Sequence, residues 1–191
     1  MSKVVIQGNA SGTGNFTIAA PNSDTNRTLT LPDEAGTVLT TATAGVPVNG
    51  PAFRAYRGAD QSISNSTATK VQLNTENFDT ADCFDSTTNY RFTPTVAGYY
   101  QFSAVLNLGG TSVTNAQAQI RKNGATASQF VFYAPGETTQ YQINATLSDL
   151  IYMNGSTDYV ELYGYISAGS GNIFGGGTKQ AFLSGYLARS A

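Results

Sequence analysis

The side chains that come closest to a chemical site in this sequence are acidic and lie in one short stretch. Glu76, Asp79, Asp82 and Asp85 follow one another at intervals of three residues. Oxygen-rich loops of this kind can hold Ca²⁺, although this spacing is not that of an EF-hand. Asp79, Asp82 and Asp85 are therefore candidate calcium ligands, and the alternative that we prefer is a solvated loop between two strands without a cofactor.

The residue types needed for catalysis are scarce. The chain contains no His, which removes the commonest general base and the Ser-His-Asp arrangement. A glycine-rich stretch, 169–177, resembles a phosphate cradle, but no helix is predicted after it, and a loop is expected instead. The single Cys83 cannot form a disulfide within the chain. The sequence therefore predicts a protein that is not an enzyme.

Composition narrows the range of partners. Only 12% of the residues are charged, the net charge is −2, and no basic run is present. Such a chain lacks the positive field that a phosphate backbone or an anionic membrane surface would require. No apolar run reaches the length of a signal peptide or a membrane span. We expect no nucleic acid, no membrane insertion, and assembly in a cytoplasm.

The elements from Pro51 onward read as consecutive β-strands separated by turn signals. In the segment 98–106, alternation places Tyr100, Phe102, Ala104 and Leu106 on one face, which we assign to the core. An Asn-Gly pair at 123–124 predicts a hairpin turn.

A second strand, 158–167, carries Tyr159, Tyr163 and Tyr165 on the face opposite its apolar residues. Three aromatic rings in line would leave a large apolar surface exposed, so we expect another subunit to cover them. The aromatic residues of the closing strand, Phe182 and Tyr186, are candidates for the same subunit interface.

Residues 1–45 contain short apolar pieces separated by Gly-, Asn-, Ser- and Pro-rich breaks. Such pieces cannot form a core alone, so they predict an arm of short strands that pairs with another surface, the alternative being an unstructured tail. A linker at 46–50 separates this arm from the domain at 51–191. The apolar residues of the arm that would anchor it are Leu29, Leu31, Val38 and Leu39.

The domain at 51–191 resembles the C1q family. The segment 92–102, FTPTVAGYYQF, is similar to the family signature, in which a turn ending in Gly precedes an aromatic-X-aromatic strand. Further matches occur in the family's order at 51–55, 71–74, 120–124, 158–162 and 182–187. Two departures affect loops: Thr157-Asp158 stands for the usual Gly-Asp turn, and Pro94 lies one position early. The resemblance implies an all-β, C1q/TNF-like jelly-roll sandwich that assembles as a homotrimer and acts by binding.

The arm resembles a different group of proteins. The segment 26–40, NRTLTLPDEAGTVLT, is similar to N-terminal segments of tailed-phage fibre and structural proteins. No Gly-X-Y collagen repeat precedes the C1q-like domain. Together the two resemblances imply a bacteriophage virion protein whose arm attaches to other capsid or tail proteins.

Three functions follow as hypotheses. The first is a trimeric capsid decoration protein or short fibre on the virion, which we prefer because only a short arm precedes the head. The second is a tail-fibre receptor-binding protein that recognises a host surface glycan. The third, more remote, is a polysaccharide depolymerase, for which no motif selects a pair of carboxylates.

Overall fold

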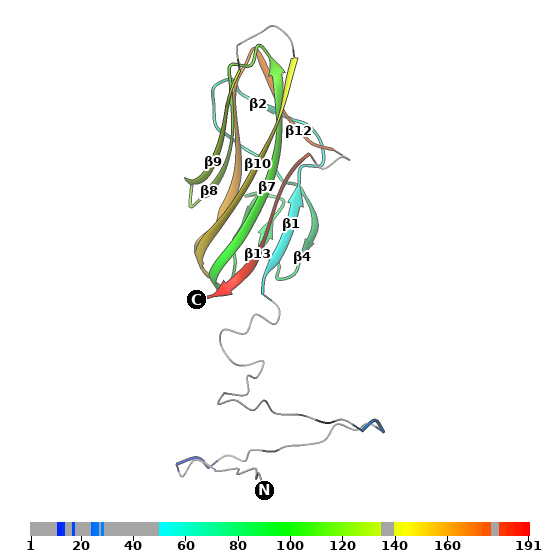
Figure 1. The fold of residues 1–191 in the computed structure, drawn as a ribbon, viewed down its shortest axis with the longest axis vertical. Coiled ribbons are helices and arrows are strands. Elements are labelled where there is room, and N and C mark those ends of the chain that lie inside the picture. The colour runs from blue at the N-terminus through cyan, green and yellow to red at the C-terminus, as the bar shows by residue number, and fades with distance from the viewer. Residues whose placement is uncertain are drawn as a thin grey trace. The chain divides into compact units, whose positions relative to one another are not determined.

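The computed structural model describes residues 50–134, 140–176 and 180–191, with isolated positions before residue 50. By its internal contacts the chain divides into two units, Met1–Val38 and Leu39–Ala191. All of the described strands belong to the second unit (Figure 1). No helix long and apolar enough to cross a membrane occurs among the described residues.

The described strands form two antiparallel sheets, which confirms the predicted all-β class. Sheet A contains β1 (Ala52–Tyr56), β2 (Gln61–Ile63), β4 (Thr75–Asp79), β7 (Ala97–Thr111), β10 (Gln140–Asn154), β12 (Ser170–Phe174) and β13 (Ala181–Ser190). Sheet B contains β3 (Thr69–Lys70), β5 (Phe84–Asp85), β6 (Arg91–Phe92), β8 (Asn115–Lys122), β9 (Ala125–Tyr133) and β11 (Val160–Ser167).

The long strand β7 organises sheet A. Along its whole length β7 pairs with β10 on one side. On the other side β12 pairs with residues 107–111 and β13 with residues 98–106, after which β1 and β4 complete the sheet. In sheet B the order is β5-β6-β11-β8-β9, with β3 also paired to β11. Among the described strands, β9 and β10 are therefore edge strands.

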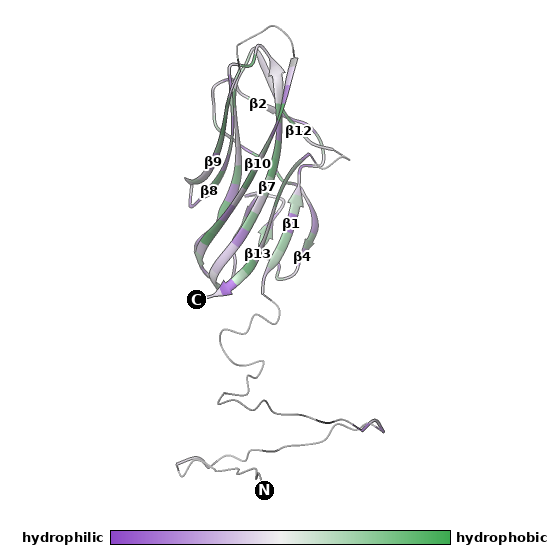
Figure 2. Ribbon diagram, in the orientation of Figure 1, coloured by the Kyte–Doolittle hydropathy of each residue, from purple (hydrophilic) through white to green (hydrophobic). Residues whose placement is uncertain are grey.

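The core lies between the two sheets and follows the predicted alternation. Tyr100, Phe102, Ala104 and Leu106 of β7 are at most 1% exposed, which confirms the assignment of this face to the core. Figure 2 shows apolar and polar residues following one another along β7 and β10. On β11 the four residues predicted to share the apolar face, Val160, Leu162, Gly164 and Ile166, are all buried.

An aromatic cluster fills one part of the core. Phe53 stacks on Phe92 with ring centroids 4.3 Å apart and on Phe84 at 5.0 Å, and Phe102 meets Phe53 edge-on at 6.4 Å. The hydroxyl of buried Tyr100 donates to the carbonyl of Val96 at 2.8 Å, and burial raises the pKa of Tyr100 to about 12. These contacts join strands that lie far apart in the sequence.

Two glycines explain local features of the fold. Asn123 and Gly124 both have positive φ (51° and 81°) and join β8 to β9, so the predicted two-residue hairpin turn is confirmed. Gly185 lies over the aromatic cluster, where an added Cβ would stand 2.7 Å from Cδ1 of Phe102. The closing strand can therefore cross this ring only with glycine at that position.

Candidate subunit interface

The outer face of sheet A, which we call the sheet A face, carries most of the exposed large apolar side chains. Across β10, β7 and β13, Leu150 lies opposite Gln101 and Gln101 opposite Tyr186, and Leu150 and Tyr186 are 53% and 54% exposed. Tyr152 pairs with Tyr99 on the same face, with ring centroids 5.5 Å apart. Contiguous exposed apolar side chains on a soluble protein are a feature of protein–protein interaction sites.

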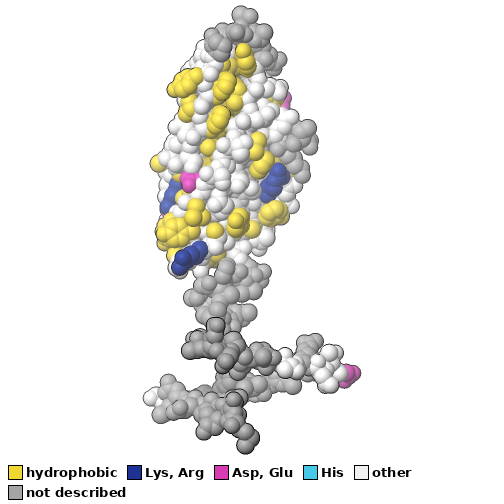
Figure 3. All heavy atoms as spheres, viewed as in Figure 1, with side chains coloured by type: hydrophobic (Ala, Val, Ile, Leu, Met, Phe, Trp, Pro, Cys, Tyr) yellow, Lys and Arg dark blue, Asp and Glu magenta, His cyan; other side chains and the backbone are white. Residues whose placement is uncertain are grey.

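The sheet A face is also poor in charge. Among the described outward-facing residues of β1, β7, β10 and β13, the charged ones are Arg54 and Arg189, and neither Asp nor Glu occurs. Figure 3 views the head from the side of this sheet and shows hydrophobic patches set in uncharged surface, with few charged side chains. Depletion of charge together with enrichment of aromatic residues is typical of the centre of a protein–protein interface.

Two hollows make this face uneven. One, of about 240 Å³, is lined by residues of four strands, among them Arg54, Phe78, Gln101 and Tyr186. The other, of about 570 Å³, lies near the chain end and is lined by Tyr99, Leu150 and residues 188–191. Hollows with mixed apolar and polar walls can receive side chains of a protein partner.

A second incompletely covered region lies where the edge strands β9 and β10 meet, and we call it the β9–β10 edge. Phe130 and Phe132 of β9 pack against the core but are only partly buried. The inward residues Ile143 and Ile151 of β10 keep 8% and 7% exposure, whereas Phe102 of neighbouring β7 is fully buried. The sandwich is thus less tightly closed along this edge than at its centre.

The residues predicted to form the subunit interface fall on two different sheets. Phe182 and Tyr186 of β13 lie on the sheet A face, and the guanidinium of Arg54 stands 4.3 Å from the centre of the Phe182 ring. Tyr159, Tyr163 and Tyr165 lie on the outer face of sheet B. The five residues therefore do not form one continuous surface, and their part in a subunit interface stays a prediction.

The three tyrosines of sheet B are half-buried within the single chain. Arg91 of β6 stands 4.4 Å from the ring centre of Tyr159, and Arg121 of β8 stands 4.1 Å from that of Tyr163. Cation–π contacts of this kind cover ring faces within a single chain. No pattern around 158–167 pointed to these arginines, because they come from strands distant in sequence.

Sequence reasoning missed Tyr99, Leu150 and Tyr152, which are central to the sheet A face. A signal for Tyr99 was present: it directly precedes core residue Tyr100, so alternation turns it outward. Leu150 and Tyr152 likewise alternate with the buried Ile151 and Met153.

The predicted anchor residues Leu29, Leu31, Val38 and Leu39 lie outside the described residues. Their role stays a prediction.

The acidic stretch is held by hydrogen bonds within the chain. The Asp79 carboxylate accepts the backbone N–H of Phe84 at 2.6 Å. The Asp85 carboxylate accepts the backbone N–H groups of Thr87, Thr88 and Asn89 at 2.9–3.0 Å, and these bonds hold its pKa well below the usual range. Asp79 and Asp85 are half-buried and bind backbone N–H groups of their own loop, whereas Asp82 is exposed.

The calcium hypothesis stays a prediction. Asp82 and Asp85 line a polar hollow of about 580 Å³ that also includes Glu76 and Arg91. Within the described part of the chain, no group of three His, Cys, Asp or Glu side chains is arranged to hold a metal ion.

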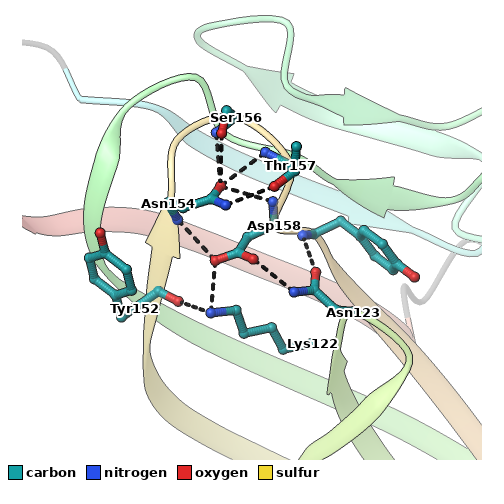
Figure 4. A network of polar contacts seen from close by, with 8 residues as sticks. Lys122, Asn123, Tyr152, Asn154, Ser156, Thr157 and Asp158 are labelled. Atoms are coloured by element: carbon teal, nitrogen blue, oxygen red, sulfur yellow. Dashed lines mark hydrogen bonds and ion pairs between the residues drawn. The ribbon is translucent and has the colours of Figure 1, made fainter.

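A polar network fixes the end of β10 beside the β8–β9 hairpin (Figure 4). The Asp158 carboxylate accepts hydrogen bonds from Nζ of Lys122 at 2.8 Å, Nδ2 of Asn123 at 2.7 Å and the backbone N–H of Asn154 at 3.0 Å. The same Lys122 ammonium donates to the carbonyl of Tyr152 at 2.7 Å. Through these bonds Asp158 positions the strand that carries Tyr152.

Comparisons with known proteins bear on the fold. No protein-family model matches the sequence, and no curated protein matches it. Among solved structures, Eiger TNF from S. frugiperda matches with a TM-score of 0.57 at 10% identity over 74% of this chain and 93% of that chain. Murine APRIL at pH 5.0 matches with a TM-score of 0.54 at 10% identity over 73% of this chain and 99% of that chain. The described head of this chain is an all-β, C1q/TNF-like jelly roll.

Proposed function

We propose that this protein is a non-enzymatic structural protein of a tailed-bacteriophage virion. Its jelly-roll head forms a trimer that projects from the particle, and its N-terminal arm attaches to capsid or tail proteins. The observation that carries the proposal is the pairing of a TNF-like head with the segment 26–40, which resembles phage structural proteins. The role is that of a capsid decoration protein or short fibre.

The charge-poor sheet A face supports assembly into a homo-oligomer. The sheet A face and the β9–β10 edge are different surfaces of the same chain. When one surface of a subunit contacts a different surface of the next, the contact is heterologous and closes into a ring if the rotation allows. The C1q resemblance implies three subunits, and the proposal adopts that number.

Such a contact would have to cover a broad part of the sheet A face. Obligate interfaces commonly bury more than about 2,000 Å² in total. The exposed apolar residues of sheet A extend across five adjacent strands, from Tyr152 on β10 to Phe78 on β4. A ring of three would cover this face in every subunit.

Light scattering coupled to size-exclusion chromatography tests the assembly. A trimer of the 20.0 kDa chain has about three times that mass, roughly 60 kDa. A stable 20.0 kDa species at micromolar concentration would overturn the homotrimer.

Electron microscopy of the virion with an antibody against the head tests the location. Regularly spaced label on the capsid or on a short appendage is expected. Absence of label from intact particles that contain all other structural proteins would refute the virion role. Label confined to the distal tip of a tail fibre, with loss of adsorption on antibody binding, would favour the host-attachment function instead.

The arm can be tested in the same particles. Residues 47–191 alone are expected to trimerise but not to join virions that lack the full-length protein. Equal occupancy of truncated and full-length protein would show that the anchor does not lie in the arm.

A further inference from the structure

Each of the two candidate contact surfaces carries an isolated charge. On the sheet A face this charge is Arg54, whose guanidinium lies over the Phe182 ring and donates to Oδ1 of Asn77. The ion pairs formed among the described residues are Lys70–Glu161 and Lys122–Asp158, and Arg54 takes part in neither. Its positive charge is therefore not balanced by a described carboxylate of its own chain.

At the β9–β10 edge the charge is Asp149. This residue lies opposite Phe102 in the register, on the inward side of edge strand β10, and it is half-buried. Its carboxylate accepts hydrogen bonds from Oγ of Ser128 on β9 and from the backbone N–H of Leu150 at 2.8 Å. No described Lys or Arg pairs with it. Removing a carboxylate from water without a cation is costly, so a subunit contact that covers this edge favours a cation nearby.

The strand register puts these two charges at the same level of the head. Asp149 pairs with Phe102, Phe102 with Gly185, and Gly185 with Phe53, so these four residues form one row across sheet A. Arg54 follows Phe53 directly, which displaces it along the strands by about 3.3 Å. In a ring whose symmetry axis is parallel to the strands, the rotation that relates two subunits leaves every residue at the same height along that axis. The β9–β10 edge of one subunit can then contact the sheet A face of the next with Asp149 and Arg54 at nearly the same height.

The other arginine of the sheet A face, Arg189, does not lie at the level of Asp149. Arg189 pairs with Tyr99, and Tyr99 pairs with Tyr152. This row is three residues from Asp149, which corresponds to about 10 Å along the strand. Within a ring whose axis follows the strands, the register selects Arg54.

We propose that Asp149 of one subunit forms an ion pair with Arg54 of the partner subunit, and that this pair fixes the level at which neighbouring subunits meet. The inference rests on the proposed homo-oligomer. Apolar contacts between a broad face and an edge tolerate sliding along the strands, whereas a single pair of opposite charges in a charge-poor contact favours one level. Electrostatic complementarity of this kind contributes specificity more than affinity.

A double-mutant cycle with neutral substitutions tests the pair with little disturbance of the fold. Arg54→Gln, Asp149→Asn and the double variant are compared with wild type by the subunit dissociation constant from sedimentation equilibrium. Asn at position 149 keeps Oδ1 as an acceptor for the backbone N–H of Leu150, and its Nδ2 can donate to Oγ of Ser128. Each single variant is expected to dissociate at least tenfold more readily than wild type, and the double variant no more readily than either single one. Raising the salt concentration should weaken wild type more than any of the three variants.

Charge reversal gives an independent readout. Arg54→Asp and Asp149→Arg should each weaken assembly further, and the double reversal should recover most of it. Arg189→Asp, which reverses the other arginine of the sheet A face, is the matched control and should not restore assembly when it is combined with Asp149→Arg. If circular dichroism shows that a charge-reversed variant does not fold, the ion pair is judged from the cycle of neutral variants alone.

The outcomes separate this inference from the proposed function. Suppose that the wild-type protein is a trimer. Additive effects of the two substitutions, or single variants that dissociate like wild type, would then overturn the ion pair but not the homotrimer. A wild-type protein that is monomeric would overturn both.

Discussion

Substitution of Gly185 offers a direct test of how the closing strand packs on the aromatic cluster. In Gly185→Ala the new Cβ would lie 2.7 Å from Cδ1 and 2.9 Å from Cε1 of Phe102, and 3.0 Å from Cε1 of Phe53. Ring carbons in a filled core cannot retreat without moving their neighbours, so overpacking should destabilise the fold by about 1–3 kcal/mol. Because the new Cβ clashes mainly with Phe102, the loss of stability caused by Gly185→Ala should depend on the presence of that ring.

Phe102→Ala removes the ring and should by itself reduce the free energy of unfolding by about 3–5 kcal/mol, because Phe102 is fully buried. In the double variant the methyl group introduced at position 185 enters space that the ring has left. The combined loss should therefore be smaller than the sum of the two single losses, by about 1 kcal/mol or more. A typical domain has only about 5–15 kcal/mol of stability, so this difference decides whether the double variant folds.

Urea-induced unfolding followed by circular dichroism measures these free energies. All variants must be compared at one subunit concentration, since the stability of an oligomer depends on it. Gly169→Ala is the matched control, because the atoms that its Cβ would approach belong to Thr111 and not to the aromatic cluster. Its effect should add to that of Phe102→Ala. Additive losses for Gly185→Ala and Phe102→Ala, or a neutral Gly185→Ala, would refute the proposed packing.

Three further outcomes are expected. The hydrogen bond with Lys122 is the main reason that the pKa of Asp158 lies below its ordinary 3.8. The ionised Asp158 carboxylate therefore stabilises the fold fully above about pH 4, and this stabilisation is lost as the pH falls through the folded-state pKa. Melting curves of Asp158→Asn should thus differ from wild type most at neutral pH and converge in acid, whereas Asp82→Asn should follow wild type throughout. Asp85→Asn should lower the melting temperature with or without a chelator, because it weakens several N–H acceptor bonds. If instead the chelator lowers the melting temperature of wild type by several degrees and leaves Asp85→Asn unaffected, the loop holds a metal ion. Gly124→Ala forces a side chain into positive φ and should cost about 1 kcal/mol in chemical denaturation, and a neutral result would contradict the observed turn.

The sequence alone was sufficient to predict the longer strands and their buried faces. The expectation of a loop at 169–177 was wrong, because β12 (Ser170–Phe174) lies there and pairs with β7 and β2. The alternation that placed Tyr100 and Phe102 in the core is a local property, because successive side chains of any strand point to opposite sides. The Asn123-Gly124 turn is equally local, since both residues accept positive φ. The resemblance of short motifs between 51 and 187 to the C1q family implied the jelly roll, and the similarity to Eiger TNF and APRIL confirms that fold.

The position of each outward face was decided by the tertiary structure. Alternation shows that Tyr163 and Tyr186 point away from the core, but it does not say on which sheet each strand lies or what stands beside it. The strand pairing puts Tyr163 next to Arg121, which covers its ring, and leaves Tyr186 54% exposed on the other sheet.

Strand pairing between distant segments also determines the positions of Arg54 and Asp149. The four-residue row that sets Asp149 level with Arg54 joins β10, β7, β13 and β1, and the two charges are almost a hundred residues apart in the chain. The acidic loop is a local case. The backbone N–H groups that donate to the Asp85 carboxylate are close to it in sequence, but they point toward it only in the folded turn. Periodicity determines which way a side chain points, whereas its neighbours depend on strand pairing between distant segments, which no local pattern encodes.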